Sequence, residues 1–158
     1  PVVEWLEKRR DQLPCQRPSP VHQDYHPNNV LVTDDGSAVV IDWTGFAISD
    51  SRIDLAWTLV LAYAYTGVEA RDSILREYER LAGAEVEQIE CFEVFACARR
   101  LFDVTVSLLE GAERRGMRPE AITAMKQQMG AHKRVYDLML ERTGIRVAEF
   151  ELLYEALS

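Results

Sequence analysis

The segment NVLVTDDGSAVVID, residues 29–42, constrains the fold more than any other part of the chain. Two short runs rich in β-branched residues flank the turn sequence Asp-Asp-Gly, and this combination is typical of a β-hairpin. We therefore predict a hairpin in this segment, with Asp42 at the end of its second strand.

The chain on either side of this hairpin has the apolar spacing of α-helices. The prolines of PCQRPSP, residues 14–20, end the first helical segment and predict an irregular connection. Segment 85–116 is apolar nearly all round in its middle, which is typical of a buried central helix. The predicted fold class is α+β, mainly α-helical, as one domain over residues 1–158, with helices at 1–13, 51–67, 69–83, 85–116, 119–144 and 147–157.

Composition and charge exclude several classes of function. The formal net charge is −8, whereas a nucleic-acid-binding domain needs a basic face. The sequence has no apolar run near the roughly 18 residues of a membrane span, and it has no signal-peptide layout at its start. Cys91 and Cys97 fall at apolar helical positions without metal-site spacing. These features predict a cytoplasmic protein with reduced, buried cysteines and with neither nucleic acid nor membrane as partner.

A cluster of polar residues precedes the hairpin in VHQDYHPNNVLV, residues 21–32. Phosphoryl transfer needs one carboxylate to orient the acceptor hydroxyl and take its proton, and an amide oxygen and a second carboxylate to hold Mg²⁺. His22, Asp24 and Asn29 have the spacing of the protein-kinase catalytic loop, and Asp42 follows after the hairpin. The cluster therefore predicts phosphotransfer chemistry.

The same segments resemble the aminoglycoside phosphotransferase and choline kinase family, which belongs to the protein-kinase-like superfamily. The motifs of that family read H-G-D-x-x-x-x-N-[VIL], then I-D-W or I-D-F, then D-P-x-x-D-L-A. Here HQDYHPNNVL, IDW and DSRIDLA appear in that order, over about a quarter of the chain. Gln23 and Asn28 replace glycines and Ser51 replaces a proline, but every catalytic group is present. The resemblance implies a kinase-like C-terminal lobe with a small catalytic-loop β-hairpin.

The resemblance also implies a role for each matching residue. Asp24 would be the catalytic base, while Asn29 and Asp42 would bind Mg²⁺ and, through it, the phosphates of ATP or another nucleoside triphosphate. His22 and Asp54 would support the catalytic loop. The implied reaction moves the γ-phosphate to a hydroxyl of a small molecule, and a cationic acceptor would suit the acidic chain.

Two parts of a kinase are missing from the sequence. No two of the eight glycines are close enough for a GxGxxG loop, and Lys8, Lys126 and Lys133 all lie in predicted helices rather than on a strand. The N-terminal, ATP-covering lobe is therefore absent from the chain. Because the first residue is Pro1, we expect a fragment of a two-lobe protein, which is inactive alone and has its own N-terminal lobe as a partner.

Two other functions compete with phosphotransfer. The pattern His22-x-Asp24-x-His26 supplies imidazole and carboxylate ligands that a metal-dependent hydrolase can use. A non-catalytic helical interaction module is the second alternative, but such a module has no need of Asp24, Asn29 and Asp42 together.

The acidic residues of the central helical segment have two interpretations. They either line a pocket for a cationic acceptor or form a solvated helix face, and a solvated face is the commoner arrangement. The residues concerned are Glu90, Glu93, Asp103, Glu110 and Glu113.

Overall fold

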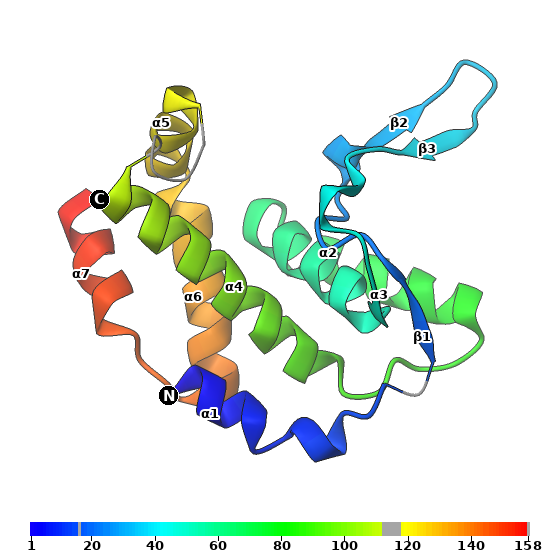
Figure 1. Cartoon of the computed structure of the whole chain (residues 1–158), viewed down its shortest axis with the longest axis horizontal. Coiled ribbons are helices and arrows are strands. Elements are labelled where there is room, and N and C mark those ends of the chain that lie inside the picture. Colours follow the sequence, from blue (N-terminus) through cyan, green and yellow to red (C-terminus); the bar gives the residue numbers. More distant parts are fainter. Residues whose placement is uncertain (16, 112–117, 158) are drawn as a thin grey trace.

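The computed structural model describes residues 1–15, 17–111 and 118–157, and most of them are helical. A body of helices carries two small sheets on one side (Figure 1). This architecture agrees with the predicted α+β, mainly α-helical class. The helices are α1 (Val2–Glu7), α2 (Arg52–Tyr65), α3 (Val68–Ala82), α4 (Ile89–Glu110), α5 (Pro119–Gln127), α6 (Met129–Thr143) and α7 (Ala148–Leu157), with 3₁₀ turns at Arg10–Gln12, Pro27–Asn29 and Trp43–Gly45.

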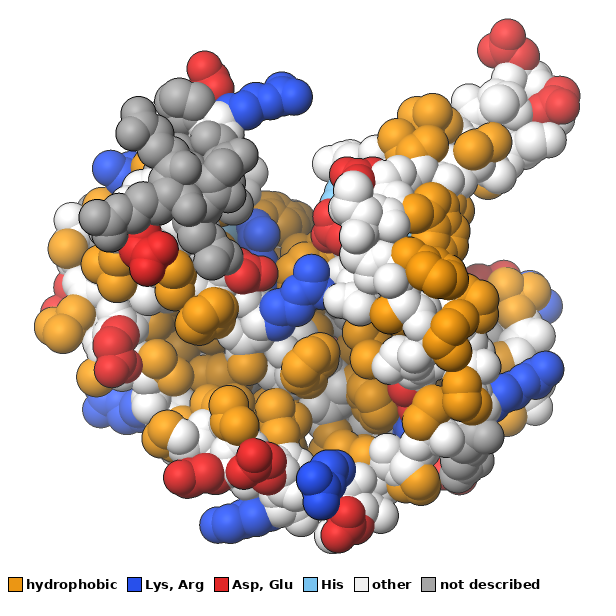
Figure 2. Space-filling view, in the orientation of Figure 1, with side chains coloured by type: hydrophobic (Ala, Val, Ile, Leu, Met, Phe, Trp, Pro, Cys, Tyr) orange, Lys and Arg blue, Asp and Glu red, His pale blue; other side chains and the backbone are white. Residues whose placement is uncertain are grey.

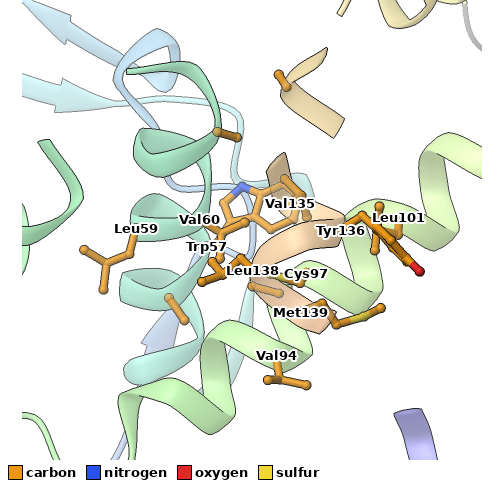
Figure 3. Packing of buried hydrophobic residues seen from close by; sticks show 14 of the residues in the cluster. Trp57, Leu59, Val60, Val94, Cys97, Leu101, Val135, Tyr136, Leu138 and Met139 are labelled. Carbon is orange, nitrogen blue, oxygen red and sulfur yellow. The ribbon is translucent and has the colours of Figure 1, made fainter. Parts of the chain in front are cut away.

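Helix α4 lies at the centre of the body, as its apolar sequence predicts. In Figure 1 it crosses α6, with α2 and α3 on one side and α1 and α7 on the other. Burial of each large apolar side chain contributes about 1.5–3 kcal/mol, so the contacts of α4 with α2 and α6 hold the body together. The core residues labelled in Figure 3 are Trp57, Leu59 and Val60 of α2, Val94, Cys97 and Leu101 of α4, and Val135, Tyr136, Leu138 and Met139 of α6.

Three predicted helix boundaries were wrong. The first helix ends at Glu7 and continues only as a 3₁₀ turn. Helix α4 begins at Ile89, after Gln88 adopts the left-handed conformation with φ of 59°. Segment 119–144 forms two helices that meet at Gln128 rather than one, and Gly130 just beyond lowers helix propensity by about 1 kcal/mol. The predicted extension of the central helix through 112–116 lies outside the described residues.

The predicted hairpin is confirmed. Strands β2 (Val30–Val32) and β3 (Ala38–Val40) pair antiparallel, with Leu31 opposite Val39. Figure 2 shows the hairpin standing out from the helical body, with hydrophobic side chains along it and acidic side chains at its tip. Asp35 at this tip accepts hydrogen bonds from Thr33 and Ser37, which lower the pKa of its carboxyl to about 2.

A second pair of strands includes residues 18–20, the last part of the segment 14–20 for which an irregular connection was predicted. Strand β1 (Pro18–Val21) pairs antiparallel with β4 (Ala47–Asp50). Prolines lack the N–H of a ladder but are tolerated on edge strands, and both strands of a two-stranded sheet are edges. The pairing brings the start of the polar loop, at His22, close to the start of α2. Asp50 accepts a hydrogen bond from the backbone N–H of Arg52, the first residue of α2, and so satisfies one of the N–H groups that have no partner within the helix.

Two further predictions concern the environment of the protein. Cys91 and Cys97 are buried and unpaired, and burial raises the pKa of both thiols, whereas Cys15 is exposed. Within the described ranges, no helix combines the length and the apolar character needed to cross a membrane.

Candidate active site

The polar loop that follows β1 is fixed to helix α2 by the carboxylate of Asp54. Its Oδ2 accepts the backbone N–H of His22 at 2.6 Å, and its Oδ1 accepts the backbone N–H of Gln23 at 2.7 Å. Hydrogen bonds to an ionised acceptor are roughly twice as strong as neutral ones. One side chain of α2 therefore fixes two successive peptide groups of the loop, at the place where the sequence predicts loop support.

His22 connects the loop to the hairpin from a position that is 1% exposed. Its Nδ1 accepts the backbone N–H of Asp24 at 3.2 Å, so the proton lies on Nε2, which donates to the carbonyl of Ile41 at 2.8 Å. Neither ring nitrogen is free, so the predicted His22-Asp24-His26 metal set lacks its first ligand. The described residues include no group of three or more His, Cys, Asp or Glu side chains that could hold a metal ion.

Asp24 has one carboxylate oxygen engaged and one largely open. Oδ1 accepts the indole N–H of Trp57 at 2.9 Å. Oδ2 lies 3.4 Å from the His26 ring and 3.4 Å from the Asn29 amide nitrogen, both at the long limit of a hydrogen bond. The side chain is 47% exposed. This geometry leaves Oδ2 available to a substrate hydroxyl.

Asn29 and Asp42 lie at the base of the hairpin. The amide nitrogen of Asn29 donates to the backbone carbonyl of Asp24 at 2.9 Å, which leaves its side-chain oxygen without a donor among the described residues. The backbone N–H of Ile41 donates to the backbone carbonyl of Asn29 at 2.9 Å. The backbone of the next residue, Asp42, therefore lies close to that of Asn29. Asp42 is exposed, and its backbone has the left-handed conformation, with φ of 63°. Its carboxylate accepts a hydrogen bond from the Thr44 hydroxyl at 3.0 Å.

Gln23, which replaces the glycine of the family motif, has φ of 67°. This left-handed conformation favours glycine, because a Cβ costs about 1–2 kcal/mol there. Neighbours hold the peptide in place: Arg99 donates to the Gln23 carbonyl, and a Cβ at Gly45 would lie only 2.9 Å from the carbonyl oxygen of His22. Asn28, the other replaced glycine, is not among the residues with positive φ.

Trp57 and Arg99 are site residues that the sequence analysis missed. Trp57 is 5% exposed and belongs to the core, yet its N–H holds Asp24 and its ring lies 4.4 Å from the Arg99 guanidinium. Residues three apart on a helix share a face. The spacing of Asp54 and Trp57 in IDLAW was therefore the available signal, whereas Arg99 comes from α4 and had none.

A cavity of about 620 Å³ begins at Asp24 and extends along α2. Asp24, His26 and Trp57 line one part of it, and Tyr65, Arg100 and Gln128 line another. Burial and the nearby Arg100 guanidinium lower the pKa of His132, on α6, to about 4. The cavity volume is that of a small-molecule site.

The acidic residues of α4 do not line this cavity. Glu90 and Glu110 are exposed, as expected of a solvated helix face. Glu93 belongs to neither predicted arrangement, because it is fully buried between Arg71 and Arg142. Asp103 lies 4.0 Å from Arg99, and Glu113 lies outside the described residues.

The comparisons with known proteins agree with the family predicted from the motifs. The model of the phosphotransferase enzyme family matches residues 2–96, which is more than half of the chain and includes the polar loop, the hairpin and α2. No curated protein matches the chain. The matched region contains every residue singled out by the motifs, and the chain belongs to the phosphotransferase enzyme family.

Proposed function

We propose that this chain is the kinase-like C-terminal lobe of an enzyme that moves the γ-phosphate of ATP, or of another nucleoside triphosphate, to a hydroxyl of a small molecule. The setting of Asp24 carries the proposal. One oxygen of its carboxylate is held by Trp57, and the other is open at the edge of a cavity of about 620 Å³. Membership of the phosphotransferase family supports the reaction class.

In this proposal Asp24 is the general base. Its Oδ2 accepts the hydrogen bond of the acceptor hydroxyl, because Oδ1 is already bonded to Trp57. The acceptor oxygen bonds to the γ-phosphorus while the bond from that phosphorus to the bridging oxygen breaks. The proton passes to Asp24 and the nucleoside diphosphate leaves. His22 and Asp54 are positioning residues, since they hold the backbone that carries Asp24.

We assign Asn29 and Asp42 to a Mg²⁺ ion. The amide oxygen of Asn29 and the carboxylate of Asp42 are hard oxygen donors, which Mg²⁺ prefers. Mg²⁺ takes few ligands from protein and completes its shell with water and phosphate oxygens, so two side chains fit its needs. The bound ion would neutralise charge on the nucleotide phosphates.

Replacement of the base tests the proposal. Phosphate transfer from ATP is measured by ³¹P NMR on the purified native protein, with a pool of sugars, amino sugars, amino alcohols, sugar acids and sugar phosphates as acceptors. Asp24→Asn is expected to lower turnover by about 10²–10⁴-fold, the usual contribution of a general base. Asp34→Asn removes an equal charge at the exposed hairpin tip and should leave turnover unchanged. Wild-type turnover in Asp24→Asn would refute the assignment.

The size of the native product tests the lobe assignment. We expect the isolated chain to be inactive and the native protein to include an N-terminal lobe that covers ATP. Intact-mass measurement in the source cell should then give a product well above 18.1 kDa. A folded native product of 18.1 kDa, bound to a protein partner, would instead establish the helical interaction module.

A further inference from the structure

Arg100 of α4 is a cation at the cavity wall whose charge is not matched by a carboxylate among the described residues. Seven other described arginines contact an acidic side chain, in a chain with a net charge of −8. They are Arg10, Arg52, Arg71, Arg80, Arg99, Arg142 and Arg146.

The contacts of Arg100 hold it while using only part of its hydrogen-bonding capacity. Its Nη2 donates to the Tyr65 hydroxyl at 3.0 Å, and that hydroxyl donates to Oε1 of Gln128 at 2.9 Å. A guanidinium has five N–H donors, and most of those of Arg100 have no acceptor among the described residues. Its Nε is buried and has no hydrogen-bond partner in the described part of the chain. A ligand in the cavity could therefore pair with the remaining Nη donors.

Helix α2 sets the separation between this cation and the catalytic carboxylate. Trp57 donates a hydrogen bond to Asp24, and Tyr65 accepts one from Arg100. Both residues line the cavity. Eight residues at a rise of 1.5 Å place these anchors about 12 Å apart along the helix axis.

We infer that the acceptor is an anionic hydroxyl compound, such as a sugar phosphate or a sugar acid, whose anionic group pairs with Arg100 while its hydroxyl meets Asp24. The cavity of about 620 Å³ between them has room for a hexose derivative. Arginine suits this task because its planar fork binds carboxylate and phosphate through paired hydrogen bonds. The inference rests on the proposed phosphotransfer and replaces the cationic acceptor expected from the net charge, since the acids of α4 lie away from the cavity.

Three ligands with one skeleton and different charges test the inference. Glucose 6-phosphate, glucose and glucosamine are titrated into the purified native protein by calorimetry at low salt, without nucleotide. Glucose 6-phosphate is expected to bind at least about 10-fold more tightly than the other two, since charge-assisted hydrogen bonds contribute about 1.5–3 kcal/mol. Tighter binding of glucosamine, or no detectable binding of glucose 6-phosphate at millimolar concentration, overturns the inference.

Variants locate the anion site. Arg100→Gln should weaken glucose 6-phosphate binding about 10- to 100-fold, and Arg100→Lys should weaken it less. Arg80→Gln removes the same charge from the exposed face of α3 and should change nothing. If Arg100→Gln does not fold, Tyr65→Phe removes the hydroxyl that holds the guanidinium and should weaken binding several-fold. Unchanged binding in the folded Arg100 variant, or in Tyr65→Phe where that variant has to be used, would refute the site.

Failure of this inference differs from failure of the proposed function. Phosphate transfer that depends on Asp24 but favours a cationic acceptor keeps the function and overturns the anion site. Binding of glucose 6-phosphate that depends on Arg100, without any transfer that depends on Asp24, keeps the anion site and overturns the function.

Discussion

Glu93 is expected to be the most important charged residue for the stability of this fold. It is 0% exposed, and its carboxylate joins three helices: Oε1 accepts from Arg71 of α3 at 2.8 Å, and Oε2 accepts from Arg142 of α6 at 2.6 Å. Glu93→Gln keeps the shape but leaves two partly buried guanidinium groups facing a neutral amide. Removal of one partner from a buried ion pair costs about 3–5 kcal/mol, which is a large share of the roughly 5–15 kcal/mol of a typical domain.

Urea unfolding measures this loss. With a slope of about 1–3 kcal/mol per molar urea, a loss of about 4 kcal/mol lowers the midpoint by about 2 M. Glu90→Gln is the matched control, because it makes the same change on an exposed position of the same helix and should stay within about 0.5 kcal/mol. If Glu93→Gln unfolds within 1 kcal/mol of that control, at an unchanged slope, the buried network does not hold the three helices together.

Three further predictions concern the loop and the cavity wall. Asp54→Asn replaces one acceptor oxygen by an amide donor facing a backbone N–H, so we expect a loss of about 1–3 kcal/mol in urea unfolding and lower turnover in the phosphate-transfer assay. Gln23→Gly should be about 1 kcal/mol more stable than Gln23→Ala by the same unfolding measurement, because only the glycine relieves the left-handed backbone. Since His132 keeps its pKa near 4 in the folded protein but near 6.5 in the unfolded chain, unfolding takes up a proton between these values, and stability should fall by about 2 kcal/mol from pH 7 to 4.5. His132→Phe should remove that part of the pH dependence, and an unchanged profile would contradict it.

Local chemistry explains which parts of the fold were predictable. The Asp-Asp-Gly turn and its β-branched flanks determine the hairpin within a few residues, so pattern alone identified it. Strand β1 was missed because Pro18 and Pro20 argue against a strand, and only its partner β4, nearly thirty residues later, makes the pairing possible. The break between α5 and α6 at Gln128 was missed for a similar reason, since the apolar spacing continues through it. Packing against the rest of the fold, which no local pattern shows, decides where one helix ends and the next begins.

The residues of the candidate site fall into the same two groups, those with a local sequence signal and those without one. Asp24, Asn29 and Asp42 could be proposed from the sequence because their spacing along one loop and one hairpin is a local property of it. Arg100 and Tyr65 come from different helices and meet only in the folded chain, so no spacing in the sequence indicates them. The cationic acceptor was expected from the total charge, whereas a ligand responds to the few groups that line its cavity, so acceptor charge stays a prediction for the binding assay.

One face of α2 connects the loop to the cavity. Asp54 holds the start of the loop, Trp57 holds the carboxylate of Asp24, and the Thr58 hydroxyl donates to the Tyr25 carbonyl at 2.7 Å. One and two turns further on, the same side of the helix reaches the cavity wall and Tyr65. Because a single rigid helix positions both Asp24 and the residue that holds Arg100, the distance between them is set by backbone geometry. If Asp24 is the base and Arg100 the anion site, as we propose, a substrate is selected by the spacing of its two polar groups as well as by its charge.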